Sequence, residues 1–371
     1  MPLTFPPAVV EQAVNDPVTT YTRRCNIFEA DNTTLFRGSV PMVNVGNVTI
    51  DMGASTRRNA ELALINEGGS IDIDRNNGLW YDKVIKIYMG VEIGGVSWEQ
   101  PIGSFLIDRI KSSGLSQEVR FTLRDFSKKL SFNVPYALEW PIATPVENII
   151  QTLASGGGVG PAQTNLPLTG ANTTSIHTVN NGTLRWKAMS DLAIAFGYDL
   201  FFDEHGVLQM ETFTDPSVSA PQYVFRTGQF SNVAKIDREI ADDLIRNHIV
   251  VKGEQADGTP VWGEAENNNA TSPTRIAVLG RRTREYDSSW VVSNTQAVEV
   301  AERFLKVQSL ERYETQLSTI TIPWMDVNET VEFDDPRKAV GDPTRYLLNR
   351  VSIPLDLSAA SARLGRVTSV L

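Results

Sequence analysis

Residues 98–133 constrain the fold of this chain more than any other stretch. Residues 119–123 alternate apolar and polar side chains, and residues 104–110 do so less strictly, which is typical of strands with one buried face. Gly114 lies between the two runs and favours a turn, so we expect a pair of β-strands followed by a short polar helix start. No catalytic group accompanies the pair, and the pattern indicates a scaffold sheet.

The composition is that of a folded protein of two or three domains. The chain has 371 residues, of which 41% are hydrophobic and 21% are charged. The single cysteine, Cys25, excludes an internal disulfide and a multi-cysteine zinc site, so stability must come from packing. No run of about 18 apolar residues occurs and the N-terminus does not resemble a signal peptide. We therefore expect synthesis in a cytosol-like compartment and no stable membrane insertion.

The charge of the chain bears on its partners. There are 44 acidic against 34 basic residues, which gives a formal net charge of −10. Such a protein repels DNA overall, so specific nucleic-acid binding is not expected. The same sign would also let DNA slide through a channel without being held by phosphate contacts, although a role in solubility is the simpler interpretation.

The first domain is expected to span residues 1–134. Residues 1–20 contain four prolines and predict an extended arm that could pack on a neighbour. Residues 21–130 show strand and turn signals almost throughout, and Gly94 with Gly95 predicts a two-residue hairpin turn. The pattern favours an antiparallel barrel or a strongly bent sheet.

The second domain is expected at residues 135–235, with both helices and strands. Residues 144–147 form a capping-box sequence, Thr-Pro-Val-Glu, that predicts the start of a short helix. Residues 155–170 carry five glycines and two prolines and predict a loop without a regular element. Residues 183–196 repeat apolar side chains at helical spacing, and Gly197 is expected to end that helix.

A hairpin at 199–211 is expected to follow, and then a third domain at 236–371. Residues 244–252 predict a strand and residues 254–274 a long polar loop. A second capping box at Ser293 opens an amphipathic helix that extends to about Ser309. Further strands are predicted at 313–322, 346–355 and 363–370.

No stretch of the sequence carries a convincing catalytic or metal-binding motif. The glycines at 156–160 lack the Gly-Lys-Ser/Thr of a phosphate-binding loop, and residues 72–78 miss the ligand spacing of a calcium loop. The acidic pairs at 242–243 and 334–335 are interpreted as solvated charge. The histidines lie in separate regions without a metal-ligand pair, and the last two show no evident orienting partner: His177, His205 and His248. We expect no catalytic residue, no cofactor and no metal.

Seven tryptophans are scattered along the chain and are best explained as core and interface anchors. Trp140 and Trp324 each lie beside a proline near the edge of a predicted element or domain. We expect these two to make contacts between domains or between subunits.

The order of these parts resembles that of the tail hub, or baseplate hub, proteins of long-tailed bacteriophages and related injection machines. The similarity is carried by the strand at 101–108 with its hairpin partner, the exit from the sheet at 125–130, and the helix-hairpin unit at 183–213. The late helix with its closing strands is similar to tail-tube subunits. The resemblance implies a β-rich α+β fold in which two tail-tube-like antiparallel β-barrel domains flank a smaller α+β domain.

This resemblance also implies a function. It predicts a non-enzymatic structural protein of the virion, located at the tail tip and made in the host bacterial cytoplasm. Three copies would form a ring that joins the tail tube to the tip and forms part of the DNA ejection channel. The implied partners are the distal tail or tail tube protein, the tape-measure protein, and spike or fibre proteins, with DNA present only in transit.

Two other functions stay open. A receptor- or carbohydrate-binding distal tail protein would also be β-rich and poor in cysteine, but a sugar platform needs several exposed tryptophans on one face. A hub fused to a cell-wall hydrolase is the other, and we expect no room for a lytic domain after the final strands.

Overall fold

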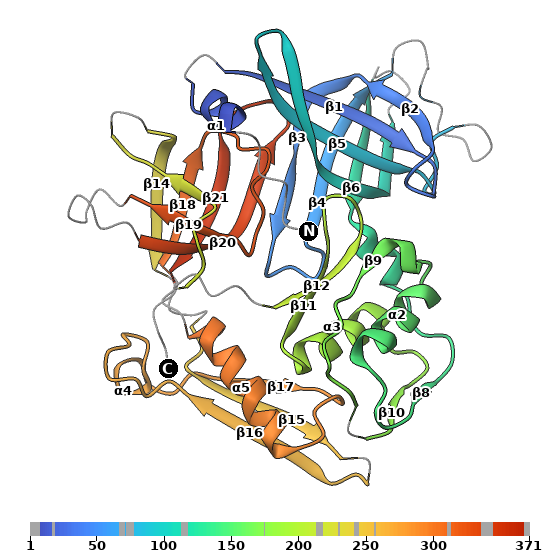
Figure 1. The fold of residues 1–371 in the computed structure, drawn as a ribbon, viewed down its shortest axis with the longest axis vertical. Coiled ribbons are helices and arrows are strands. Elements are labelled where there is room, and N and C mark those ends of the chain that lie inside the picture. Colours follow the sequence, from blue (N-terminus) through green and yellow to red (C-terminus); the bar gives the residue numbers. More distant parts are fainter. Residues whose placement is uncertain are drawn as a thin grey trace.

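The computed structural model describes residues 8–16, 19–66, 71, 78–112, 118–173, 175–212, 218–228, 231–240, 245–255, 257–309, 313–334 and 344–366. A large, strongly bent sheet occupies the upper part of Figure 1, two helices with short strands lie at the lower right, and a helix on a small sheet lies at the bottom. The apolar residues form two cores, one inside the large sheet and one shared by the two lower parts.

The first half of the large sheet is antiparallel throughout. Ile93 pairs with Val96, and Gly94 and Gly95 between them have φ of 57° and 81°, so the predicted hairpin is confirmed. The predicted turn at Gly114 lies outside the described residues. The strands of this half are β1 Thr20–Phe28, β2 Leu35–Val40, β3 Met42–Asp51, β4 Arg58–Ile65, β5 Val84–Ile93, β6 Val96–Ser112 and β7 Glu118–Arg124.

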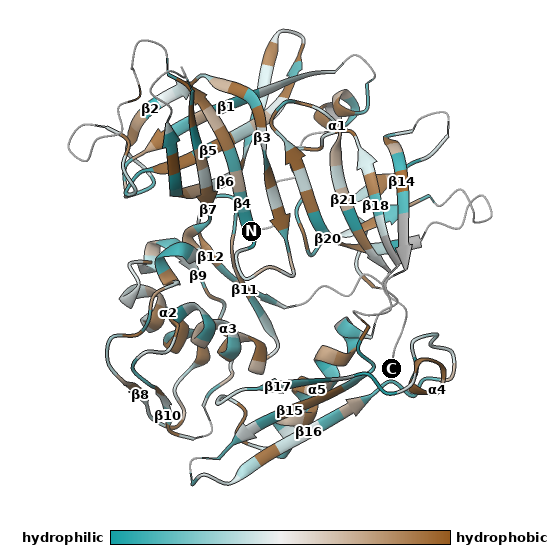
Figure 2. Cartoon of the chain, turned by 180° about the vertical axis from the view of Figure 1, so that it is seen from behind, coloured by the Kyte–Doolittle hydropathy of each residue, from teal (hydrophilic) through white to brown (hydrophobic). Residues whose placement is uncertain are grey.

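Strands from the end of the chain complete the same sheet. They are β13 Tyr223–Phe225, β14 Val233–Ile240, β18 Tyr313–Thr319, β19 Thr330–Phe333, β20 Thr344–Pro354 and β21 Ala360–Arg366. The order is β14-β18-β21-β20-β3-β4-β7-β6-β5-β1-β2, with β19 beside β20 and β13 beside β19. Hydrophobic residues alternate with hydrophilic ones along many of these strands, as Figure 2 shows from behind.

The two halves of the sheet join where β3 pairs with β20. Ile50 lies opposite Val351, and the Asn47 Nδ2 donates to Ser352 Oγ at 3.1 Å. Within the described residues no strand pairing closes the sheet into a barrel. The structure therefore confirms a β-rich fold with a large antiparallel sheet, and the division into two barrels stays a prediction.

The N-terminal arm differs from its prediction. Residues Ala8–Val14 form a helix, α1, where an extended segment was expected. Val10 and Val14, four residues apart, are both buried in the core of the large sheet, and this burial favours the helix. The short helix start after β7 is confirmed as the 3₁₀ helix Phe126–Leu130, with Asp125 as its N-cap.

The middle region contains two helices, α2 Val146–Gly156 and α3 Arg185–Ala195. Its strands are β8 Leu138–Trp140 paired with β10 His177–Val179, and β11 Tyr198–Phe202 paired with β12 Leu208–Thr212. Gly197 has φ of 86° and follows the end of α3, as expected from the sequence. The predicted hairpin is confirmed by β11 and β12.

Two predictions for this region are wrong. The capping box at 144–147 does not form, because Thr144 Oγ1 donates to the Pro141 carbonyl at 2.7 Å and Glu147 accepts from Thr169. The loop at 155–170 does contain regular elements, a 3₁₀ turn at Pro161–Gln163 and the strand β9 Thr164–Asn165. The strand β9 forms because it pairs in parallel with the edge of β12, whose backbone N–H and C=O groups would otherwise lack a strand partner.

The lower part of the molecule is a three-stranded sheet covered by one helix. The strands are β15 His248–Glu254, β16 Pro260–Glu266 and β17 Thr283–Asp287, and the helices are α4 Ile276–Leu279 and α5 Asn294–Gln308. The predicted polar loop at 254–274 is wrong, since β16 lies within it. Val261, Gly263 and Ala265 are buried beneath α5, and this alternation makes the segment a strand. Ser293 caps α5 as predicted, accepting from the Gln296 N–H at 3.2 Å.

Candidate functional site

Three distant segments of the chain meet at the side chain of Arg58, the first residue of β4. The residue is 1% exposed. Its Nη2 forms an ion pair with Asp326, from the loop between β18 and β19, and lies 3.8 Å from the Glu204 carboxylate in the turn between β11 and β12. Its Nε donates to the Phe202 carbonyl at 3.3 Å. One guanidinium therefore links the large sheet to the middle hairpin.

Asp125 completes this site from the end of β7. Its carboxylate accepts the Arg58 N–H at 3.0 Å and the Ser127 N–H at 2.9 Å, and its own N–H donates to the Arg58 carbonyl at 3.0 Å. Burial raises the pKa of Asp125. The aspartate that marks the exit from the sheet is thus a fixed part of the same cluster.

The cluster holds more carboxylates than cations. The Asp326 backbone N–H donates to Glu329 Oε2 at 3.1 Å, which brings the Glu329 carboxylate close to that of Asp326. Burial, with the Asp326 charge as a second cause, raises the pKa of Glu329 to about 8. Burial likewise raises the pKa of Glu204. We call this set the Arg58 junction: Arg58, Asp125, Glu204, Asp326 and Glu329.

Neighbouring contacts hold the hairpin in the same place. Ser104 Oγ in β6 donates to the Glu204 carbonyl at 2.8 Å. Arg57 forms an ion pair with Asp199, and its guanidinium carbon lies 3.7 Å from the centre of the Phe201 ring. The arrangement fixes the orientation of the middle region against the large sheet, which is a mechanical role.

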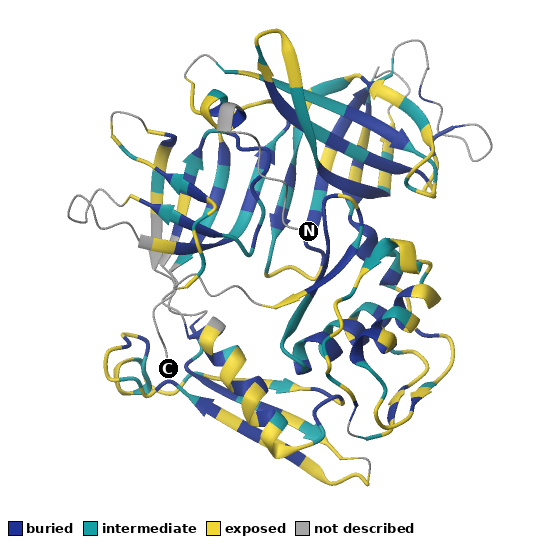
Figure 3. Cartoon of the chain, viewed as in Figure 1, coloured by how far each residue is buried: buried dark blue, intermediate teal, exposed yellow. Residues whose placement is uncertain are grey.

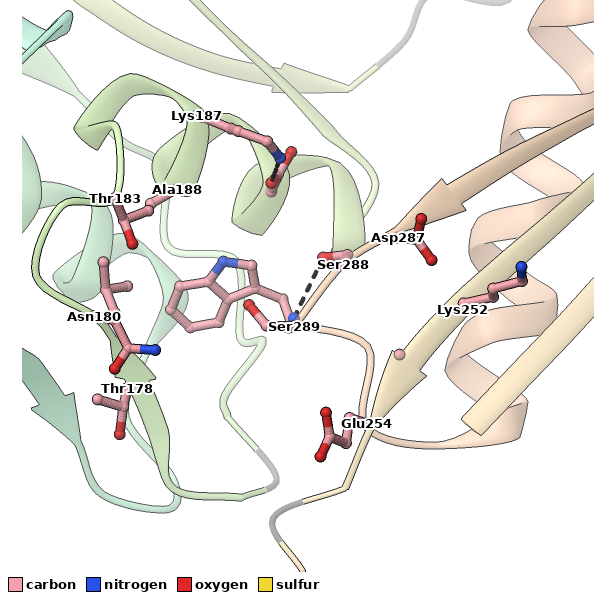
Figure 4. A pocket seen from close by; sticks show the side chains of 14 residues that line it. Thr178, Asn180, Thr183, Lys187, Ala188, Lys252, Glu254, Asp287, Ser288 and Ser289 are labelled. Atoms are coloured by element: carbon pink, nitrogen blue, oxygen red, sulfur yellow. Dashed lines mark hydrogen bonds and ion pairs between the residues drawn. The ribbon is translucent and has the colours of Figure 1, made fainter. Parts of the chain in front are cut away.

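A cavity of about 440 Å³ lies between the middle region and the lower sheet. Figure 4 shows Thr178, Asn180, Thr183 and Lys187 on one side of it and Lys252, Asp287 and Glu254 on the other. Trp290, only 3% exposed, also lines it, and its backbone N–H donates to Ser288 Oγ at 3.3 Å.

The charged groups of the cavity are partly paired. Lys187 is paired with Asp191 of the same helix, and Tyr286 donates its hydroxyl to Asp191 at 3.0 Å. Lys252 Nζ lies 2.6 Å from Glu285, and this hydrogen bond raises the pKa of the lysine. Most of the lining residues have polar side chains, and the buried indole leaves little ring surface for a sugar to stack on.

The two tryptophans predicted as contact residues are both buried within the chain. Trp140 is 8% exposed, and its ring centre lies 6.3 Å from that of Trp290. Trp324 is 4% exposed and meets Trp98 edge-on at 6.0 Å. Each pair joins segments from different predicted domains, while contacts with another subunit stay a prediction.

The histidines differ from their prediction. His205 Nε2 lies 3.2 Å from the Glu204 carboxylate, and His248 Nε2 lies 3.3 Å from Glu264 while its Nδ1 is 2.8 Å from Thr283 Oγ1. His205 and His248 therefore each have a polar partner that was not expected. The partner of His205 lies in the same turn, and those of His248 lie on the two neighbouring strands. His177 lies 4.5 Å from the Trp290 ring, and burial lowers its pKa.

Across the described ranges, no group of three or more His, Cys, Asp or Glu side chains is placed to hold a metal ion. The acidic positions at 72–77, 242–243 and 335 lie outside those ranges. None of the described helices is long and apolar enough to cross a membrane.

The Arg58 junction was not predicted from the sequence. Its main contact joins residues 268 positions apart, and a charged residue at a strand start is ordinarily exposed. The one usable signal is the pair of adjacent arginines, Arg57 and Arg58, at the start of a strand whose last four residues are all apolar.

No protein-family model and no curated protein sequence matches this chain. Solved structures do match in fold. The tail protein from Neisseria meningitidis MC58 is 14% identical in sequence and superposes with a TM-score of 0.64. The match covers 93% of this chain and 96% of the Neisseria protein. The 43 kDa tail protein of prophage MuSo2 from Shewanella oneidensis has 13% identity and a TM-score of 0.60. That match covers 92% of this chain and 98% of the prophage protein.

A third match comes from a secretion machine. The c3393 protein of E. coli, a component of the type VI secretion system that is structurally similar to the T4 tail proteins gp27 and gp5, has 11% identity and a TM-score of 0.50. The match covers 89% of this chain and 74% of that protein. The predicted likeness to phage tail hub proteins is therefore confirmed at the level of the fold.

Proposed function

We propose that this protein is a structural subunit of a phage tail, a hub protein that forms a trimeric ring between the tail tube and the tail tip. One observation carries the proposal: two tail proteins share this fold over at least 92% of both chains. A match of that extent leaves little of the chain for a separate catalytic domain, which supports a non-enzymatic role.

The proposed partners follow from the same comparison. The similarity of the E. coli protein to gp27 and gp5 supports a position at a tail hub. We propose the distal tail or tail tube protein, the tape-measure protein, and spike or fibre proteins as neighbours, in a virion whose tail tip holds this protein. Trp140 and Trp324 are proposed to hold three units together, at 1–134, 135–235 and 236–371.

We further propose that DNA passes through the ring without specific binding. The formal net charge of −10 supports this, because a surface that neutralises few phosphates does not retain DNA. The continuous sheet made by both ends of the chain is large enough to contribute to the wall of such a ring.

The native mass of the purified protein tests the proposal. We expect light scattering behind size-exclusion chromatography to give about three times the chain mass of 41.0 kDa, and negative-stain images to show rings with a central hole. A mass of one chain at every protein concentration, together with images that lack rings, would contradict the trimer. Retention on DNA-cellulose at physiological salt would contradict passage without binding.

A further inference from the structure

The small sheet of β15, β16 and β17 has one covered and one uncovered face. Helix α5 packs on one side, over Val261 and Ala265. The opposite side chains alternate with these, and Figure 3 shows buried and exposed residues in turn along β16. We call this side the outer face. Its large or charged exposed residues, which define the outer face here, are Lys252, Glu254, Trp262, Glu264, Glu285 and Asp287.

Trp262 stands out on the outer face because its side chain is large and 58% exposed. Lys252 lies opposite it in the strand register, and Asp287 is next to Lys252 on β17. The backbone N–H of Trp262 donates to Asn294 Oδ1 at 3.0 Å, which ties this strand to the start of α5. Tryptophan is among the side chains most enriched at the positions that dominate binding energy in protein interfaces.

The charge around Trp262 is mainly negative. Four of these six exposed residues are acidic, and Lys252, the one lysine among them, is already bonded to Glu285. Within the described part of the chain, Glu254 and Asp287 form no ion pair, and Glu264 is paired only with His248. Two carboxylates are thus available at the end of the face that adjoins the cavity.

The cavity continues the outer face. Glu254 and Asp287 belong to both, and they line the 440 Å³ space opposite Asn180 and Lys187 (Figure 4). The volume exceeds that of any single side chain, so the end of an arginine or lysine fits inside the cavity, whose lining includes the two carboxylates. Trp262 and the cavity are therefore parts of one continuous surface, linked by Glu254 and Asp287.

We propose that the outer face and its cavity dock a basic segment of a partner protein, with one cationic side chain between Glu254 and Asp287 and an apolar side chain against Trp262. Charge complementarity selects this occupant, because acidic segments and nucleic acids are repelled by the same carboxylates. The inference adds the chemistry of a partner to the proposed function and does not depend on ring formation.

Binding of defined peptides tests this inference. The probe is a capped hexapeptide of alternating arginine and leucine, and the comparison peptide has glutamate in place of arginine. Titrations followed by isothermal calorimetry and by tryptophan fluorescence are expected to show saturable binding of the basic peptide only. High salt is expected to weaken it, since the contacts are partly exposed.

Variants locate the site. The double variant Glu254→Gln/Asp287→Asn and the single variant Trp262→Ala are each expected to weaken binding at least about tenfold. The matched control is Glu92→Gln, an exposed acidic residue on β5 in the large sheet, which should bind like the parent protein. Thermal melts of all variants verify that the fold is intact.

Equal binding by the parent and the two outer-face variants would overturn the inference, as would the absence of saturable binding at low salt. The native mass is measured on the same samples. A monomer that still binds the peptide would contradict the ring and leave the docking surface standing, so the two failures are distinguishable.

Discussion

The Arg58 junction and the outer face of the small sheet use the same chemistry in opposite surroundings. At the junction the side chains of Arg58, Glu204 and Asp326 are 2%, 9% and 14% exposed. On the outer face those of Lys252 and Glu285 are 45% and 57% exposed. Water screens the second pair and has been removed from the first, so the junction should govern stability and the outer face recognition.

The largest expected effect comes from removing the junction cation. Arg58→Met leaves the Asp326 carboxylate buried without its cation and leaves Glu204 with His205 alone, and we expect it to lower the free energy of unfolding by about 3–5 kcal/mol. Urea denaturation followed by circular dichroism measures the change. The control is Arg120→Met, whose side chain is 65% exposed beside Glu118 and should change stability by less than about 1 kcal/mol. Equal effects of the two substitutions would remove the contrast between buried and exposed pairs.

A second test uses pH. Because the pKa of Glu329 is raised to about 8, the folded protein holds this proton more tightly than the unfolded chain does, and stability should fall as pH rises from about 5 to about 8. Glu329→Gln mimics the protonated form and should flatten that slope, so that the variant gains about 3–4 kcal/mol relative to the parent between about pH 5 and pH 8. Urea midpoints at several pH values measure it. Parallel pH profiles would show that the Glu329 proton is not bound more tightly on folding.

A smaller effect is expected at the surface pair. Lys252→Met removes an exposed ammonium, and the urea midpoint should stay within experimental error of the parent. The same variant makes the outer face more acidic and should therefore bind the basic peptide at least as well. A clear loss of stability would mean that the Lys252–Glu285 pair stabilises the fold, as the Arg58 junction is expected to do.

The smallest expected effect on stability comes from Trp262→Ala, at less than about 0.5 kcal/mol, because the indole is largely in water. Its buried counterpart is Trp290→Ala, which should cost about 3–5 kcal/mol because the residue lies in the lower core. The comparison uses the same urea titration. Similar costs for both would mean that Trp262 packs against the rest of the protein.

Local patterns predicted the elements whose causes are local. The apolar spacing of α3 and α5, the Ser293 cap and the Gly94-Gly95 turn each depend on residues within one or two turns of the chain, and all are found in the structure. The strand β16 was missed because the three residues that make its buried face include a glycine and an alanine, so its hydrophobic signal is weak.

The sites depend on contacts that local patterns do not contain. Arg58 and Asp326 are 268 residues apart, and nothing near either residue specifies the other. The cavity likewise forms between α3 and β17, whose approach is set by packing of both on a shared core. The resemblance of the order of parts to tail hub proteins supplied the fold that local reasoning lacked, but it gave neither site.

The pairing of β3 with β20 has a consequence for synthesis. The Asn47–Ser352 contact spans 305 residues, so on the ribosome, at about 5–20 residues per second, β3 waits for tens of seconds before its partner exists. During that time the strand has an unsatisfied edge that can pair with other chains. Sheets closed by such long-range contacts also fold slowly. The yield of folded protein in an expressing cell should therefore depend on translation speed and on chaperones that cover this edge until the last strands emerge.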